Sequence, residues 1–164
     1  MKIMIGNDHG GYLLKKPVVK LLQSLQITII DIGCDSDVIV RYPYYAARVA
    51  QAVSSGEVDR GILICSTGIG MSVAANRHRG VRASLCTDSY MAKMTRAHND
   101  SNLLCMGGRI TGDMLALEIV QVWLDTPYEG GRHDISLGLI QEMEQIITND
   151  TVWEWTPKED EVTP

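Results

Sequence analysis

The segment Cys65–Gly70 contains residue types that can move a proton on an anionic substrate, because a thiol there precedes a glycine-rich turn. Glycines allow close backbone approach, and N–H groups at the start of a following helix can bind an anion or a developing oxyanion. A helix start can also activate a thiol as a base or nucleophile. Taken alone, the segment slightly favours a tight turn with a buried, unreactive cysteine.

Further candidates are an acid–histidine pair, Asp8-His9, a second histidine with its neighbour, His98-Asn99, and two arginines, Arg109 and Arg132. Each has a structural alternative, because aspartate often caps a helix and a histidine near a helix C-terminus complements the helix dipole. A segment around Arg132 can equally be a surface loop. Together, however, these groups supply a base, an acid and positive charge, which general acid–base catalysis on an anion requires.

The elements that must position these residues alternate between strands and helices. Short, continuous apolar runs, typical of strands buried on both faces of a parallel sheet, occur at Lys2–Ile5, Ile27–Ile32, Gly61–Cys65, Arg82–Cys86 and Asn102–Met106. Segments with helical apolar spacing lie between them, and Pro17 is expected near the start of the first regular helix. The pattern predicts a single-domain, three-layer α/β fold with a five-stranded parallel sheet, in which ligands bind beyond the carboxyl ends of the strands.

Composition narrows the class of protein. The chain has 164 residues, 45% of them apolar, and a net charge of -5, which argues against a nucleic-acid binder because such proteins need a basic face. The four cysteines are far apart and form no metal-ligand pattern, so we expect reduced thiols in a cytoplasmic protein and no structural metal. No apolar run approaches the ~20 residues that span a bilayer, so we expect no membrane segment. The domain is predicted over residues 1–148, followed by an acidic C-terminal extension over 149–164.

An ordered set of motifs then adds a resemblance. The motifs are Asp8-His9-Gly10, Tyr42-Pro43, Gly61–Cys65, Thr67–Ser72, Ala74-Ala75-Asn76, His98–Asn102 and Tyr128–His133. From about Met1 to Ile147 the chain resembles the ribose-5-phosphate isomerase B family, which also includes allose-6-phosphate and galactose-6-phosphate isomerases. The resemblance implies a Rossmann-like fold, a homodimer or dimer of dimers with shared active sites, and neither metal nor organic cofactor.

The resemblance also implies roles in an aldose–ketose isomerisation that passes through a cis-enediolate. Cys65 would be the base that moves a proton between C1 and C2, Thr67 would orient the thiol, and His98 would be the acid for ring opening. The remaining implied residues would bind substrate: Asp8, His9 and Tyr42, the turn Ser66, Gly68, Ile69 and Gly70, and Asn99, Arg109 and Arg132. We expect His98, Asn99, Arg109 and Arg132 to reach the Cys65 site of a partner chain.

The sequence departs from the family at Ser66, where glycine is common, and in its C-terminal extension. It also carries Arg41 where an acid is common, and Ser136 where many members carry a second phosphate-binding arginine. Arg41 is interpreted either as a surface residue or as a cation that approaches the pocket and partly replaces the missing charge.

The favoured function is the conversion of ribose 5-phosphate to ribulose 5-phosphate. Within the same chemistry, the alternatives are isomerases of allose 6-phosphate, galactose 6-phosphate or a tetrose phosphate. From another class, a non-catalytic sugar-phosphate-binding subunit is disfavoured because Cys65 and His98 are both present. A flavodoxin-like nucleotide-binding domain, suggested by fold analogy alone, is disfavoured by the pattern of the glycine-rich loop.

Overall fold

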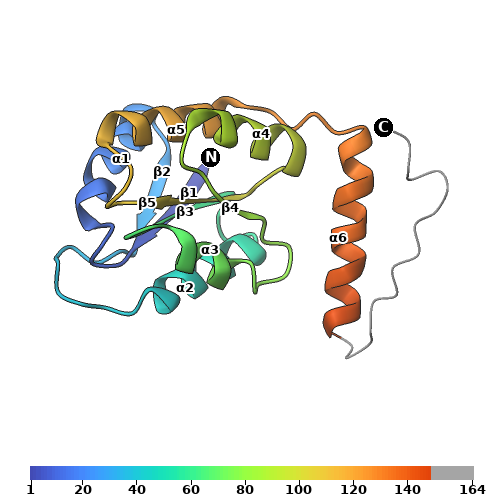
Figure 1. The fold of residues 1–164 in the computed structure, drawn as a ribbon, viewed down its shortest axis with the longest axis horizontal. Coiled ribbons are helices and arrows are strands. Elements are labelled where there is room, and N and C mark those ends of the chain that lie inside the picture. Colours follow the sequence, from blue (N-terminus) through green and yellow to red (C-terminus); the bar gives the residue numbers. More distant parts are fainter. Residues whose placement is uncertain (149–164) are drawn as a thin grey trace. The chain divides into compact units, whose positions relative to one another are not determined.

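A five-stranded, all-parallel sheet forms the centre of the molecule in the computed structural model, which describes residues 1–148 (Figure 1). The strand order is β2-β1-β3-β5-β4. The strands are β1 (Lys2–Asn7), β2 (Thr28–Asp31), β3 (Arg60–Cys65), β4 (Ala83–Leu85) and β5 (Leu103–Gly107). The helices are α1 (Tyr12–Ser24), α2 (Tyr42–Ser54), α3 (Ile69–Ala75), α4 (Ser89–Asn99), α5 (Asp113–Asp125) and α6 (Arg132–Thr148). The predicted α/β class with a parallel sheet is therefore confirmed.

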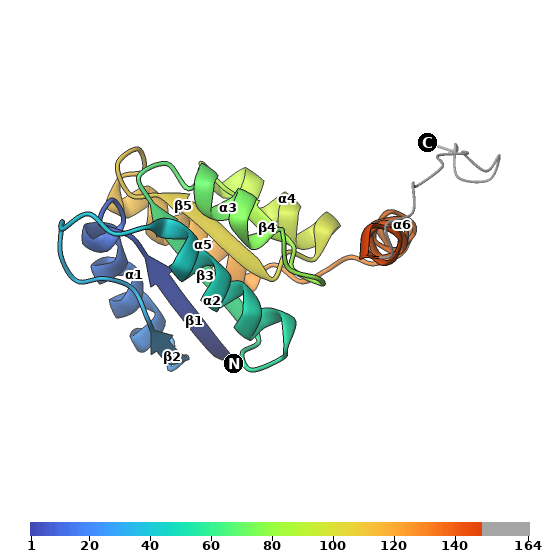
Figure 2. The same cartoon turned by 90° about the horizontal axis from the view of Figure 1, so that it is seen from below.

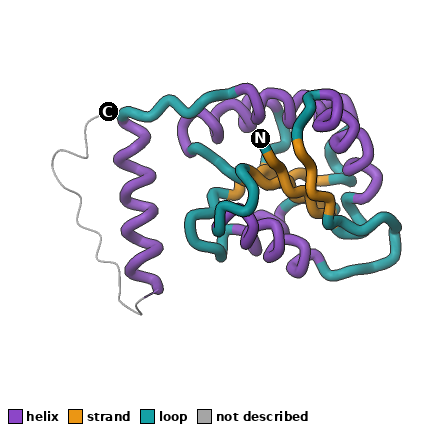
Figure 3. The backbone as a smooth tube through the Cα atoms, turned by 180° about the vertical axis from the view of Figure 1, so that it is seen from behind, coloured by secondary structure: helices purple, strands orange, loops and turns teal. Residues whose placement is uncertain are grey.

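Helices cover both faces of the sheet, which gives the three predicted layers (Figures 1 and 2). Helices α1, α4 and α5 pack on one face, where Ile5, Ile64 and Met106 are fully buried. Helices α2 and α3 pack on the other face, over Leu63 and Cys105. Alternate residues of one strand thus enter two different cores, which explains why the central strands read as continuous apolar runs. Figure 3 shows the strands enclosed between these helices.

The edge strands are shorter than expected. Strand β4 spans three residues, although Arg82–Cys86 was predicted, because it pairs on one side only and its first and last expected residues lie outside the ladder. The first helix begins at Tyr12 rather than near Pro17, which lies inside it. Leu14, 2% exposed, anchors this early turn in the core and outweighs the missing N–H of the proline.

Contacts divide the chain after Tyr128 into two compact units, each described here by itself. The first, Met1–Tyr128, holds the sheet and helices α1 to α5, and the second holds α6. The predicted extension over 149–164 lies outside the described residues, so the boundary at residue 148 stays a prediction. None of the helices within residues 1–148 has the length and apolar character that a membrane crossing demands.

Candidate active site

Three loops meet at the carboxyl edge of the sheet because they follow the three adjacent central strands β1, β3 and β5. Their backbones are joined directly: the Asp8 N–H donates to the Ile64 carbonyl oxygen at 3.2 Å, and the Gly108 N–H donates to the Cys65 carbonyl at 2.7 Å. The Arg109 N–H donates to the Ser66 carbonyl at 3.1 Å. The candidate residues after β1, β3 and β5 are thus held in one rigid cluster, as the strand-end argument predicted.

This close approach requires glycine at position 108. A Cβ atom added there would lie 2.6 Å from the Gly10 carbonyl oxygen and 2.9 Å from the Gly11 Cα atom, both of which belong to the backbone. Gly108, directly after β5, therefore lets the loops that follow β1 and β5 touch.

The thiol of Cys65 sits at the end of β3, only 6% exposed, beneath the turn into α3. The Gly68 N–H donates to its Sγ atom at 3.0 Å, and Gly68 adopts a φ of 80°, a left-handed conformation that favours glycine. A backbone donor on sulfur stabilises negative charge there, as required of a thiolate base. The Gly68 amide, expected to face substrate oxygens, is thus used to hold the thiol instead.

Thr67 is exposed, and its Oγ1 accepts a 3.4 Å hydrogen bond from the Ile69 N–H. No hydrogen bond joins Thr67 to Cys65 anywhere in the described residues, so the expected orienting role is not visible as a direct contact. The side chain instead lies at the mouth of the turn, where it can meet a substrate.

The other three thiols lie in environments that oppose ionisation. Burial raises the pKa of Cys86 to about 12 and that of Cys105 well above its ordinary range. Loss of hydration also raises the pKa of Cys34, which is only partly exposed. At neutral pH these three side chains are therefore neutral, and none is hydrogen-bonded by a turn like that at Cys65.

Asp8 and His9 follow β1 and face a pocket of about 490 Å³, which is lined by these two residues and residues 39–44. Asp8 is 5% exposed, and its Oδ1 accepts the Gly10 N–H at 2.8 Å, so the carboxylate fixes its own turn. The Nδ1 atom of His9 accepts the Val40 N–H at 3.4 Å. A ring nitrogen that accepts carries no proton, so the Nε2 atom of His9 is a donor.

Tyr42 connects this pocket to the turn after β3. It opens α2, and a Cβ atom added at Gly70 would lie 2.8 Å from the Cζ atom of its ring. The ring therefore rests on the first turn of α3 while it also lines the pocket. The structure thus gives Tyr42 a packing role, and its contact with substrate stays a prediction.

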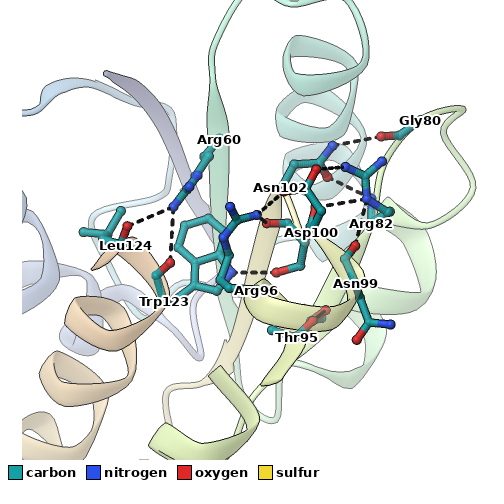
Figure 4. Close-up of polar contacts among 12 residues, drawn as sticks. Arg60, Gly80, Arg82, Thr95, Arg96, Asn99, Asp100, Asn102, Trp123 and Leu124 are labelled. Carbon is teal, nitrogen blue, oxygen red and sulfur yellow. Dashed lines mark hydrogen bonds and ion pairs between the residues drawn. The ribbon is translucent and has the colours of Figure 1, made fainter. Parts of the chain in front are cut away.

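His98 and Asn99 lie at the other edge of the sheet. Helix α4 starts after the carboxyl end of β4 and runs back over its 11 residues, about 16 Å, to the amino end of β5. The Arg82 side chain, which precedes β4, donates to the Asn99 carbonyl at 3.0 Å (Figure 4). Within one chain, these two residues are therefore remote from Cys65.

Two arginines, the buried Arg96 and the partly exposed Arg82, fix this end of α4 (Figure 4). Arg96, 5% exposed, donates from Nη1 to the Asp100 carboxylate and to the Ser101 carbonyl, both at 2.7 Å. Arg82 binds the second oxygen of Asp100 at 2.8 Å, and Asp100 ends the helix with a φ of 44°. Trp123 adds an indole N–H bond to the Ser101 hydroxyl at 2.7 Å. The sequence indicated polar groups at this helix end, but not that they form one ionic cluster.

Arg109 and Arg132 have different settings. We expected Arg109 to reach a partner's site, but it is exposed at the carboxyl edge of its own chain, where its backbone N–H donates to the Ser66 carbonyl. Arg132 is the first residue of α6, in the second unit, and is also exposed. Ser136 follows it by one helical turn, so the two share a face of α6.

The carboxyl edge of one chain thus brings together most of the predicted site: Asp8, His9, Tyr42, Cys65, Ser66, Thr67, Gly68, Ile69, Gly70 and Arg109. It does not include His98 or Asn99. Within Met1–Tyr128, no group of three histidine, cysteine or carboxylate side chains comes together as metal ligands.

Residues 3–140 match the family described as ribose/galactose isomerase. The chain is 47% identical over 144 residues to ribose-5-phosphate isomerase B of Escherichia coli, which covers 88% of this chain and 97% of that protein. The solved Clostridium thermocellum ribose-5-phosphate isomerase B superposes with a TM-score of 0.87 at 50% identity, covering 88% and 98% of the two chains. The enzyme of Mycoplasma genitalium, solved with bound ribulose 5-phosphate, gives a TM-score of 0.85 at 36% identity and covers 88% and 96%. This chain therefore belongs to the ribose/galactose isomerase family.

Proposed function

We propose that the protein is a cofactor-independent aldose–ketose isomerase that interconverts ribose 5-phosphate and ribulose 5-phosphate in the cytoplasm. The observation that carries this proposal is the Cys65 thiol, which receives the Gly68 N–H at 3.0 Å beside a pocket lined by Asp8 and His9. The family, and a relative solved with ribulose 5-phosphate, support the substrate class.

In the proposed reaction the Cys65 thiolate removes the proton from C2 of the open-chain aldose. The electrons of the C–H bond form a C1=C2 double bond, and those of the carbonyl bond move to O1, which gives the cis-enediolate. The O2 hydroxyl proton passes to O1, and return of the thiol proton to C1 yields the ketose. Amides of the β3–α3 turn, at Ser66 and Gly70, supply donors for the oxygens; one such donor is typically worth ~3–4 kcal/mol.

Asp8 and His9 are placed to bind the sugar. The Nε2–H of His9 is available as a donor because the Val40 N–H occupies Nδ1. Asp8, already bonded to the Gly10 N–H, retains acceptor capacity on its second oxygen for a hydroxyl group. Tyr42 and Thr67 complete this substrate-facing surface of one chain.

The acid for ring opening must come from a second chain in this scheme. His98 lies about 16 Å along α4 from the carboxyl edge, and the buried Arg96–Asp100 pair holds it there. We therefore propose a homodimer, or a dimer of such dimers, in which His98 and Asn99 of one chain complete the Cys65 site of the other. Arg132 would add positive charge in the same way, whereas Arg109 would serve its own chain.

A panel of phosphorylated sugars tests the function. The purified protein is incubated in deuterium oxide with the 5-phosphates of ribose and ribulose, and with allose 6-phosphate, galactose 6-phosphate and erythrose 4-phosphate. We expect aldose–ketose exchange, with deuterium at C1 or C2, to be fastest for the ribose–ribulose pair. Faster exchange on another sugar would reassign the substrate, and binding without exchange on every sugar would favour a non-catalytic sugar-phosphate-binding subunit.

A further inference from the structure

One wall of the pocket beside Asp8 and His9 is formed by residues 39–44, and it includes an arginine that the reaction scheme does not use. Arg41 lines this wall, is exposed, and directly precedes Tyr42, the first residue of α2. Within residues 1–148 no carboxylate pairs with its guanidinium. By contrast Arg48, the next arginine along the chain, is bound by both oxygens of Glu57 at 2.9 and 2.8 Å.

The loop that carries Arg41, residues 32–41, is fastened to the body of the protein along its length. Lys15 of α1, whose side chain is 4% exposed, binds Asp31 at 3.1 Å and Asp35 at 2.6 Å. The buried Asn7 amide donates to the Cys34 carbonyl at 2.9 Å. At the far end, Val40 donates to His9. The backbone next to Arg41 is therefore placed against His9.

The charges around the pocket favour an anion at this point. The Oδ1 atom of Asp8 is turned onto the Gly10 N–H, which reduces its repulsion of a nearby anion. His9 presents an Nε2–H donor, and Arg41 presents an unpaired planar guanidinium. A guanidinium can bind two oxygens of a phosphate at once, and a neutral imidazole donor can bind the third.

We propose that Arg41 binds the phosphate group of the substrate together with His9, and that it sets the preference of this protein for phosphorylated over neutral sugars. The inference rests on the proposed function for the identity of the substrate, but the anion site itself does not depend on turnover. Arg41 is a substrate-binding residue in this account and takes no part in the proton transfer at Cys65.

The test replaces Arg41 with glutamine and, separately, with lysine. Arg41→Gln is expected to raise KM for ribose 5-phosphate about 10- to 100-fold with kcat within about twofold, because a contact made equally in the ground and transition states changes KM alone. Arg41→Lys keeps the charge but loses the bidentate contact, so its KM is expected to lie between those of the unsubstituted protein and Arg41→Gln. The matched control is Arg79→Gln, which removes the same charge from the exposed turn between α3 and β4 and should leave KM unchanged.

Binding of inorganic phosphate, measured by calorimetry on each protein, separates this inference from the proposed function. We expect Arg41→Gln, but not Arg79→Gln, to weaken phosphate binding by a factor similar to the change in KM. Phosphate binding that depends on Arg41 in a protein without turnover would refute the proposed function and uphold the site. Phosphate binding that is undetectable in the unsubstituted protein, or equal in Arg41→Gln, would overturn the inference.

Discussion

The carboxyl edge of the sheet and the C-terminal end of α4 are both rigid, but they are held by different interactions. At the carboxyl edge, backbone bonds such as the one from Gly108 to Cys65 join neighbouring loops, so main chain fixes the thiol. At the end of α4, side chains do this work, because Arg82 and Arg96 share the Asp100 carboxylate (Figure 4).

The difference indicates a division of labour. The carboxyl edge carries the proposed base, Cys65, and a pocket beside it, and one chain supplies both. The end of α4 carries the proposed acid, firmly positioned yet remote from that base. Two preformed halves at opposite edges of one sheet are what a site shared between two chains requires, since each half can then be positioned before assembly.

The largest effect is expected from removal of the base. Cys65→Ala should lower kcat for the ribose–ribulose exchange by ~10³-fold, within the range typical of a general base, while substrate still binds. Steady-state kinetics and deuterium uptake at C2 measure this loss. Cys34→Ala is the control, because the Cys34 thiol is partly exposed and its pKa is raised. Activity within tenfold of the unsubstituted protein in Cys65→Ala would show that another group is the base.

The backbone packing at the carboxyl edge is tested by Gly108→Ala. The added Cβ atom would meet the Gly10 oxygen at 2.6 Å, so we expect ~1–3 kcal/mol of destabilisation and a displaced thiol loop. Gly138→Ala is the matched control, since a Cβ there meets nothing within 4 Å and alanine favours a helix by ~1 kcal/mol. In chemical denaturation, the free energy of unfolding should therefore fall for Gly108→Ala and rise for Gly138→Ala. Equal stability would mean that the loops are not locked together.

The ionic fixing of α4 is tested by Asp100→Asn. Asparagine tolerates the positive φ, but it leaves the buried Arg96 without a counter-charge. The cost should be about 2 kcal/mol, less than for a fully buried pair because the Asp100 side chain is 36% exposed. The proposed acid would become less well positioned, so kcat should fall severalfold with KM little changed. A lower stability with an unchanged kcat would show that this ionic cluster stabilises the fold but does not position the proposed acid.

A smaller effect is expected from Lys15→Met, which removes the amine that fastens the loop over the pocket. The substitution removes the cation only, and the Asp31 and Asp35 side chains keep contact with solvent at 35% and 89% exposure, so stability at pH 7 should fall by about 1 kcal/mol or less. KM should nevertheless rise severalfold, because the loop that carries Val40 and Arg41 loses its anchor at Asp35. An unchanged KM would show that the loop holds its position without Lys15.

The same anchor predicts a weak pH dependence. The hydrogen bond from Lys15 lowers the pKa of Asp35 below its ordinary value of 3.8, so its stabilising effect is present above that pH. It is lost as the pH falls through the lower, folded-state value. The effect is small because the Asp35 side chain is 89% exposed. Acid titrations of the unsubstituted protein and Lys15→Met, followed by circular dichroism, should differ slightly in stability above pH 3.8 and converge below it.

Much of this architecture could be predicted from local sequence patterns. The apolar runs located all five strands, and the rule for parallel sheets placed Asp8 and Cys65 at one edge. The same rule, applied to α4, also places His98 at the opposite edge, since a helix that follows a strand must return to the amino end of the next. The separation of His98 from Cys65 within one chain could therefore be predicted from the order of strands and helices in the sequence.

Other features depend on contacts between segments far apart in sequence, which periodicity does not report. Lys15, for example, is buried and bound to Asp35, 20 residues later, which the apolar spacing of the first helix does not predict. The Gly68 amide was expected to face substrate, whereas the left-handed turn directs it to the sulfur. The position of Arg41 beside His9 likewise depends on how the loop folds back over β1.

The most direct test uses two variants that are each expected to be inactive, Cys65→Ala and His98→Asn, co-expressed with different affinity tags. Mixed dimers that carry both tags are purified and assayed with ribose 5-phosphate. If the base of one chain works with the acid of the other, one of the two sites in each mixed dimer is intact, and we predict about half of the unsubstituted activity. Mixed dimers no more active than either parent would contradict a site shared between chains.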